Sequence, residues 1–266
     1  EESSLLGADK VADSVLNDLK IVDGDLFEYF SKKPKNETYF LRYWQEREKS
    51  DLSELALDWK NNETAWNTRL SNHGYASLFW LSKGNKGARI RKYYCGARVL
   101  LSLSGGNIRY FLDLIDTAIR HELDIRESNT SKELIISPKA QTLAAKDVGK
   151  RSLDQLEPLA DHGVQLKRLV LAIGKVFFEF ARDPVGRTPE VTYFVVSGKP
   201  EDIEEIRKLL AEGVTHLAFE AAPRTKATSS VEMKDDEYRL HRIFCGFFEI
   251  SHRKKRRVVF DAAHLL

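Results

Sequence analysis

The sequence is poor in cysteine and has no long apolar run. Its two cysteines, Cys95 and Cys245, both have apolar neighbours, so we expect two buried thiols and exclude a disulfide scaffold. They show no Cys–His spacing typical of a zinc site. There is also no signal-peptide pattern and no apolar stretch of membrane-spanning length, which predicts a cytoplasmic protein that does not contact a membrane.

The motifs of common catalytic sites are absent as well. The chain has no Gly-x-x-x-x-Gly-Lys-Ser/Thr loop to cradle a triphosphate, since Gly84–Gly87 is too short and lacks the Ser or Thr. It has no His-Glu-x-x-His, no Gly-x-Ser-x-Gly, and no apolar strand that ends in Asp-Glu to hold Mg²⁺. The seven histidines have no metal-ligand spacing. We therefore predict no catalytic residue and no metal-binding residue in this chain.

Length and composition indicate a globular protein of two domains. The 266 residues are 42% hydrophobic and 10% aromatic, which is enough for a sizeable core and argues against disorder. The sequence begins with glutamate, and its one methionine is Met233. We therefore expect a piece of a longer protein, in which the missing part holds the chemistry.

The net charge of +2 conceals an uneven distribution. Residues 1–31 carry eight acidic residues against two lysines, whereas residues 64–112 contain no Asp or Glu and eight cations. A second basic zone comprises Arg239, Arg242 and the run Arg253, Lys254, Lys255, Arg256 and Arg257. Two basic zones in a nearly neutral chain favour contacts with phosphates of a nucleotide or a nucleic acid. The alternative is ordinary solvated surface.

Hydrophobic periodicity predicts a mostly α fold with a small β-sheet. We expect a helical region over residues 1–127 and a second domain over residues 128–266, separated at a polar break. Residues 8–30 have helical character, residues 37–60 predict one or two helices, and residues 64–81 predict one helix or a short helix pair. Further helices are predicted over 93–103, 107–123, 137–159, 164–182 and 199–213. Strands are predicted over 191–197, 214–221 and 238–244, with a last one over 258–260.

The order of elements after residue 164 is that of a winged helix-turn-helix domain. The polar loop Pro223–Asp236 would be the wing, with Arg224 and Lys226 facing double-stranded DNA. Two features depart from the pattern: one helix lies between the first two strands where two are usual, and that helix begins with acidic residues. Because winged helices also bind proteins, a protein partner stays open beside DNA.

A Gly-Gly turn opens the helix predicted from residue 107. Ile108, Phe111, Leu112 and Ile115 fall on one face, and Arg109 lies in the first turn, away from that apolar stripe. A cation beside the N–H groups of a helix start suits a phosphate. The alternative is a solvated arginine. Downstream, Asp113 and Asp116 allow acid–base work, but surface salt bridges are the more common use of such residues.

Two stretches resemble a known family. Residues 92–96 with 103–112, which contain Gly106-Asn107-Ile108-Arg109, resemble the lid of AAA+ ATPases, and match best the bacterial and archaeal relatives of the origin-recognition ATPases. Residues 237–256 resemble the end of the winged helix in the bacterial group. The resemblance covers about residues 64–260 in the family order, lid and then winged helix. The Walker A, Walker B and sensor-one elements of the family are not in this chain.

The resemblance implies specific roles. Arg109 takes the place of the sensor-two arginine that reaches the γ-phosphate, with Gly106 and Asn107 in the turn before it. The intact protein would use ATP with Mg²⁺ and bind double-stranded DNA through Arg224, Lys226 and Arg253–Arg257, as a homo-oligomer or with protein partners. The chain alone would need no cofactor and hydrolyse no ATP. Residues 1–60 would end the ATPase base or be an insertion in it.

Two alternatives to a C-terminal part of such an ATPase stay open. One is a degenerate member of the family that never binds nucleotide, and the other is a non-enzymatic winged-helix adaptor that binds protein or DNA.

Overall fold

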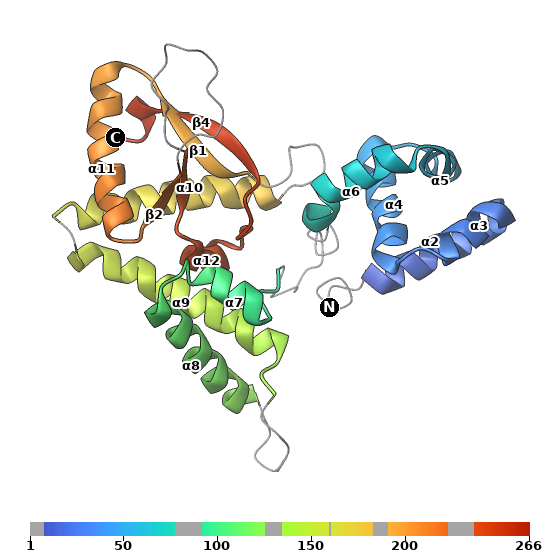
Figure 1. The fold of residues 1–266 in the computed structure, drawn as a ribbon, viewed down its shortest axis with the longest axis horizontal. Helices are drawn as coiled ribbons and strands as arrows, with labels where there is room; N and C mark the ends of the chain where they lie inside the picture. Colours follow the sequence, from blue (N-terminus) through green and yellow to red (C-terminus); the bar gives the residue numbers. More distant parts are fainter. Residues whose placement is uncertain (1–7, 78–91, 126–134, 160, 183–190, 223–236) are drawn as a thin grey trace. The chain divides into compact units, whose positions relative to one another are not determined.

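A computed structural model describes residues 8–77, 92–125, 135–159, 161–182, 191–222 and 237–266. The chain forms two compact units, one of Glu1–Arg91 with Phe180–Pro189 and one of Lys92–Glu179 with Glu190–Leu266. Each is described by itself (Figure 1). The second unit begins at Lys92, so it includes helices that were predicted as part of the first domain. The functional division at residues 127 and 128 stays a prediction.

The described part of the first unit is helical, with α2 (Ala8–Val22), α3 (Gly24–Ser31), α4 (Lys35–Glu48), α5 (Leu52–Asn61) and α6 (Glu63–Ser77). The helical character predicted over residues 8–30 is confirmed, and Asp23, in an extended conformation, separates α2 from α3. Its carboxylate accepts hydrogen bonds from the amides of Asp25 and Leu26, which caps α3.

Tryptophans build the core of the first unit. Trp59 and Trp66 are fully buried and stack with ring centroids 4.5 Å apart. Asp58 accepts hydrogen bonds from Trp66 Nε1 at 2.8 Å and from Arg69 Nη1 at 3.2 Å. The guanidinium of Arg69 also lies 4.6 Å from the centre of the Trp66 ring. Arg69 is one of the eight cations in the acid-free residues 64–112, and it is therefore part of this packing.

The second unit begins with α7 (Ala97–Leu103), α8 (Ile108–Ile125), α9 (Pro138–Leu159), α10 (Gly163–Arg182) and α11 (Pro200–Thr215). Helix α9 starts as predicted, with Ser137 Oγ accepting from the Ala140 amide and proline in the first helical position. It contacts α8 as well as η2 (Arg242–Phe244) and α12 (Cys245–Phe248). Gly246 allows this close packing, since a Cβ there would stand 2.5 Å from the Ala145 carbonyl.

The four-stranded sheet has the order β2-β3-β1-β4, formed by β1 (Val191–Ser197), β2 (Phe219–Ala222), β3 (Glu237–Leu240) and β4 (Arg256–Asp261). Strand β3 pairs antiparallel with both β1 and β2, and β4 pairs parallel with β1. The predicted strand 191–197 is confirmed. The predictions over 214–221 and 238–244 are too long, because α11 continues to Thr215 and η2 begins at Arg242. The short helix η3 (Ala262–His264) follows β4.

Buried aromatic residues hold the second unit together. The hydroxyl of Tyr94 lies 2.8 Å from the carbonyl oxygens of both Cys245 and Ile250, which are far from it in the sequence.

Cys245 is buried, which raises the pKa of its thiol to about 12. Cys95 is only half-buried, so the prediction of two buried thiols holds for one of them. Neither forms a disulfide.

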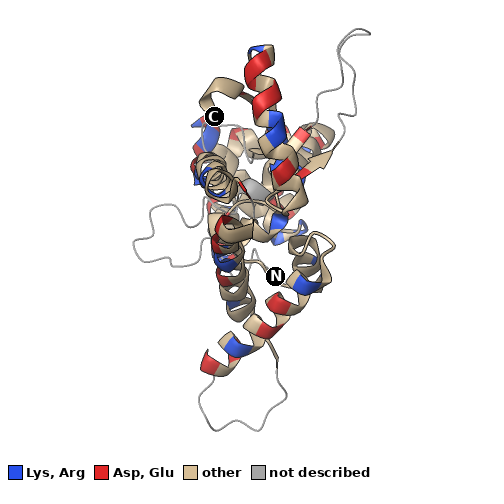
Figure 2. Cartoon of the chain, turned by 90° about the vertical axis from the view of Figure 1, so that its left-hand side faces the viewer, with Lys and Arg blue, Asp and Glu red and all other residues tan. Residues whose placement is uncertain are grey.

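Several helices carry both basic and acidic residues (Figure 2). Within the described ranges, no helix is both long enough and apolar enough to cross a membrane.

Candidate functional site

The Gly-Gly turn before α8 has a backbone that only glycine adopts readily. Gly105 and Gly106 have φ values of 61° and 86°, in the left-handed region. The next residue, Asn107, donates its amide to the Ser104 carbonyl at 3.0 Å. Its side-chain oxygen accepts the Arg109 amide at 2.9 Å, and its carbonyl accepts the Phe111 amide. Asn107 is therefore the N-cap of α8, and Arg109 stands in the first turn.

Arg109 is exposed at this helix start. Among the residues that the structure describes, its guanidinium has no hydrogen-bond or ion-pair partner. A guanidinium near the positive end of a helix can bind a phosphate oxygen.

A buried histidine lies against the turn. A Cβ on Gly105 would overlap Nε2 of His241 and stand 2.8 Å from its Cε1, so no larger residue fits there. His241 is 1% exposed, and its Nδ1 accepts the Ile243 amide at 3.2 Å. Burial lowers the pKa of His241 to about 4, so the ring is neutral at pH 7.

The apolar stripe predicted on α8 is only partly covered. Ile108 is 68% and Leu112 59% exposed, whereas Phe111 and Ile115 are half-buried. The fully buried positions, which include Leu114 and Ala118, are offset from the predicted stripe. Hydrophobic periodicity in the sequence predicted the helix but not which of its faces is buried. The exposed Ile108 and Leu112 leave apolar surface beside Arg109.

Both acidic residues after the turn form salt bridges. Arg151 Nη2 lies 2.7 Å from Asp113 Oδ1, and Arg120 Nε lies 2.9 Å from Asp116 Oδ2. The salt-bridge interpretation is confirmed. Each of the two carboxylates therefore has a cationic partner on the protein.

An acidic residue neutralises part of the basic run 253–257. Glu237 Oε2 lies 3.2 Å from Lys254 Nζ, and its Oε1 lies 3.1 Å from Arg257 Nη1. Burial alone would raise the pKa of Glu237, but hydrogen bonds and charges from these two cations outweigh it, and the pKa is lowered. The Lys254 ammonium also lies 4.9 Å from the centre of the Tyr193 ring.

The same basic run surrounds a shallow hollow of about 420 Å³, lined by Tyr193, Glu237, Lys254, Lys255, Arg256 and Arg257. Within the described ranges, Lys255 has no ion-pair partner. The predicted contacts Arg224 and Lys226 lie outside the described residues.

Three residues of this region escaped the sequence patterns: Glu220, Glu237 and His241. Glu220 accepts hydrogen bonds from Arg239 Nε and Arg242 Nε, each at 3.0 Å. Burial alone would raise the pKa of Glu220, but its two arginines lower it overall. Glu220 is opposite Arg239 in the register of β2 and β3. A prediction from the sequence that these two strands pair in this register would therefore have indicated the ion pair. No local signal marks His241.

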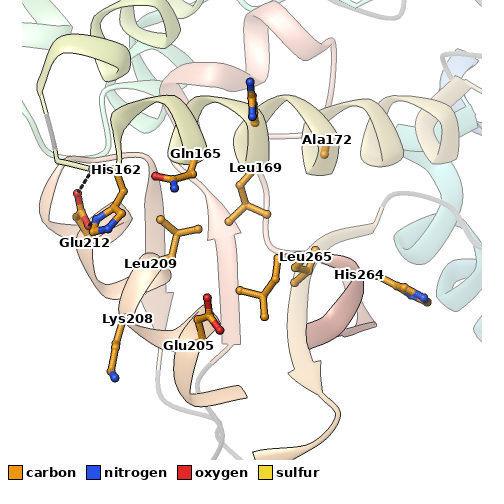
Figure 3. Close-up of a pocket in the computed structure, with 12 residues that line it drawn as sticks. His162, Gln165, Leu169, Ala172, Glu205, Lys208, Leu209, Glu212, His264 and Leu265 are labelled. Carbon is orange, nitrogen blue, oxygen red and sulfur yellow. Dashed lines mark hydrogen bonds and ion pairs between the residues drawn. The ribbon is translucent and has the colours of Figure 1, made fainter. Parts of the chain in front are cut away.

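A second hollow, of about 440 Å³, lies between α10, α11 and the residues after β4 (Figure 3). Its floor includes Leu169, Leu209 and Leu265, and at its rim His162 Nδ1 lies 2.7 Å from Glu212 Oε2. Within the described ranges, no group of three or more His, Cys, Asp or Glu residues is placed to hold a metal ion.

The fold is that of a mostly helical protein with a small mixed sheet. A model of the ORC-CDC6-like family matches residues 1–260, and the chain belongs to this family of AAA+ ATPases. The resemblance found in the sequence is thereby confirmed. The family indicates an AAA+ ATPase-related function, and its members generally use ATP with Mg²⁺, bind DNA and oligomerise. Neither the curated proteins nor the solved structures yield a match.

Proposed function

We propose that the second unit supplies the lid and the winged helix of an origin-recognition-like AAA+ ATPase. Arg109 senses the γ-phosphate, and the turn of Gly106 and Asn107 presents it. Double-stranded DNA binds the segment 223–236 and the run 253–257. The single observation that carries the proposal is Arg109 at a capped helix start, with no ion-pair partner among the residues that the structure describes.

The surroundings of Arg109 support the nucleotide role. The cap occupies the Arg109 amide but leaves the guanidinium available, and the paired Asp113 and Asp116 do not compete for it. Bound ATP with Mg²⁺ would supply the phosphoryl group and the metal that neutralises its charge. The exposed Ile108 and Leu112 give this face an apolar border on which an ATPase core can pack.

Strand order supports the winged helix. The strands β2, β3 and β1 are antiparallel neighbours, α10 precedes β1, and α11 lies between β1 and β2. That is the order of a winged helix-turn-helix domain with one of its two central helices missing. The segment 223–236 joins β2 to β3, where a wing belongs. The domain division stays as predicted, with the lid ending at residue 127.

Amide NMR of the chain titrated with Mg-ATP tests the nucleotide role. Without the phosphate cradle we expect weak binding, in the range of about 1 mM. Shifts should gather at residues 106–111 and vanish in Arg109→Ala. Arg98→Ala, an exposed cation on α7, is the matched control and should keep them. Shifts of equal size in Arg109→Ala would refute the proposal, and ATP turnover by the chain would refute the claim that it lacks catalytic machinery.

Fluorescence polarisation with a double-stranded DNA tests the DNA role. Affinity should fall steeply as salt rises, because phosphate contacts release counterions. Neutralising Arg253, Lys255 and Arg256 together should weaken binding at least about tenfold, as expected for several lost phosphate contacts. Binding that ignores both salt and these substitutions would exclude the DNA role.

The adaptor alternative has one observation in its favour. Helix α11 begins with Glu201 and Asp202, which would repel DNA phosphates, and it borders the hollow with the leucine floor. A protein partner suits that face better than DNA does. A chain that binds no DNA and no nucleotide would favour this alternative.

A further inference from the structure

We propose that two copies of this chain associate through the outer edge of β4, where the two β4 strands pair antiparallel and join both sheets into one. Strand β4 lies at one end of the sheet (Figure 1). Among the residues that the structure describes, it pairs with β1 on one side and with no strand on the other. An unpaired edge is a template for a further strand. The inference involves neither nucleotide nor DNA, so it does not depend on the proposed function.

The backbone of β4 offers donors and acceptors on its outer side. The Ser197 hydroxyl, in β1, donates to the Phe260 carbonyl at 3.5 Å, so this carbonyl points toward β1. Successive residues of a strand direct their backbone groups to opposite sides. The amides and carbonyls of Arg257, Val259 and Asp261 therefore point to the outer edge, where they can form a new ladder.

The side chains of the same three residues make the edge complementary to itself. Val259 is 57% exposed, and Arg257 and Asp261 are exposed two residues to either side of it. All three project from one face, because side chains alternate along a strand. In an antiparallel pair centred on Val259, the two valines pack on each other and each Arg257 lies opposite Asp261 of the second copy. Opposite charges directly across a ladder stabilise it, whereas a parallel pair in register would set Arg257 against Arg257.

The contacts that these charged residues already make leave room for the intermolecular pair. Glu237 Oε1 lies 3.1 Å from Arg257 Nη1, but the Arg257 side chain stays 43% exposed and a guanidinium has five donors. Asp261 Oδ1 accepts the Ala263 amide at 3.0 Å, and a carboxylate has a second oxygen. Arg257 and Asp261 can therefore pair between copies without giving up their present partners.

The basic run 253–257 does not prevent the pairing. In this register the two copies of Lys255 lie about 26 Å apart, since roughly eight residues of about 3.3 Å each separate them along the ladder. That distance exceeds the Debye length of about 8 Å at physiological ionic strength, so their repulsion is largely screened. One strand edge is small for a protein interface, and we therefore expect a weak dimer with a dissociation constant on the order of 100 µM.

Sedimentation velocity of the full chain over a concentration series, without DNA or nucleotide, tests the interface. With that dissociation constant, about two thirds of the chain should be dimeric at about 300 µM and less than about a tenth at about 5 µM. Val259→Lys sets two like charges against each other at an exposed position, so it should abolish the dimer without loss of fold. Circular dichroism checks the fold of each variant.

A charge exchange tests the register. Asp261→Arg should lose the dimer, because Arg257 then faces an arginine, and adding Arg257→Asp should recover at least about half of it. Asp116→Arg makes the same charge change at an exposed position of α8 and is the control, which should dimerise like the wild type.

Hydrogen exchange at the two concentrations locates the ladder. Amides 257, 259 and 261 should exchange about threefold more slowly at the higher concentration, in proportion to the dimer fraction, while amides 258 and 260 should not change. A chain that stays monomeric throughout the series overturns the proposal and leaves the edge to a strand of another protein. A dimer that persists in both Val259→Lys and Asp261→Arg overturns it as well, because it must form through another surface.

Discussion

Glu220 and Arg239 face each other across β2 and β3, with Arg239 Nε 3.0 Å from Glu220 Oε2. The Arg239 side chain is 11% exposed and that of Glu220 23%, so the pair is largely removed from water. Because Arg242 shares the same carboxylate, one acidic residue compensates two cations, one in β3 and one in η2.

Removing that carboxylate should therefore be costly. We expect Glu220→Gln to lower the free energy of unfolding by about 3 kcal/mol, since it leaves two poorly solvated guanidinium groups without their counter-charge. Urea denaturation measures this. The exposed Asp116–Arg120 pair is the control, and Asp116→Asn should cost less than about 0.5 kcal/mol. Equal effects of the two substitutions would contradict the burial of the Glu220 pair.

Stability should depend on pH through two buried histidines. Burial lowers the pKa of His241 to about 4 and that of His252 to about 3, against 6.5 when unfolded. Between these pKa values the unfolded chain therefore binds more protons than the folded chain. The free energy of unfolding is highest above about pH 7 and falls as the pH drops from 6.5 toward 4. For His241 alone the loss approaches about 3 kcal/mol.

Denaturation at a series of pH values measures this dependence. In His241→Gln the loss between pH 7 and 5 should shrink, because the titrating group is gone. A stability that stays constant over that range in the wild type would show that neither histidine is held neutral by the fold.

Glu237 should weaken DNA binding. Its carboxylate forms ion pairs with Lys254 and Arg257, so DNA phosphates must compete with Glu237 for these two cations. Glu237→Gln should therefore tighten DNA binding several-fold and steepen the salt dependence by about one unit for each additional phosphate that the protein neutralises. Glu201→Gln on α11 removes the same charge away from this cluster and is the control. Equally tightened binding in both variants would indicate a general charge effect.

The orientation of α8 predicts that substitutions at two of its leucines lower the free energy of unfolding by very different amounts. Leu112 is 59% exposed and Leu114 is fully buried. Leu114→Ala should cost about 2–5 kcal/mol of unfolding free energy by leaving a cavity. Leu112→Ala should cost less than about 0.5 kcal/mol. A larger loss for Leu112→Ala than for Leu114→Ala would show that α8 packs with Leu112 toward the core, as the sequence pattern predicted.

Local signals in the sequence located most helices and strand β1. Ser137 and the proline after it mark the start of α9, and the β-branched run 191–197 marks β1, because both act over a few neighbouring residues. The break at Asp23 was missed, since a capping aspartate inside an apolar pattern looks like one more surface residue.

The partners of charged residues depend on tertiary structure instead. Glu237 meets Lys254 and Arg257 only because β3 and β4 flank β1, and His241 meets Gly105 only because η2 packs beside α7 and α9. Arg109 was found from its local turn chemistry, while the residues that support it come from distant segments.

The most direct test of the account is the response of the chain's Arg109 region to ATP against ADP. In amide NMR with Mg²⁺ present, ATP should shift residues 106–111 clearly more than ADP at equal concentration, because only ATP carries the γ-phosphate that Arg109 is proposed to sense. In Arg109→Ala the two nucleotides should become equal. Indistinguishable responses to ATP and ADP in the wild type would contradict the sensor role.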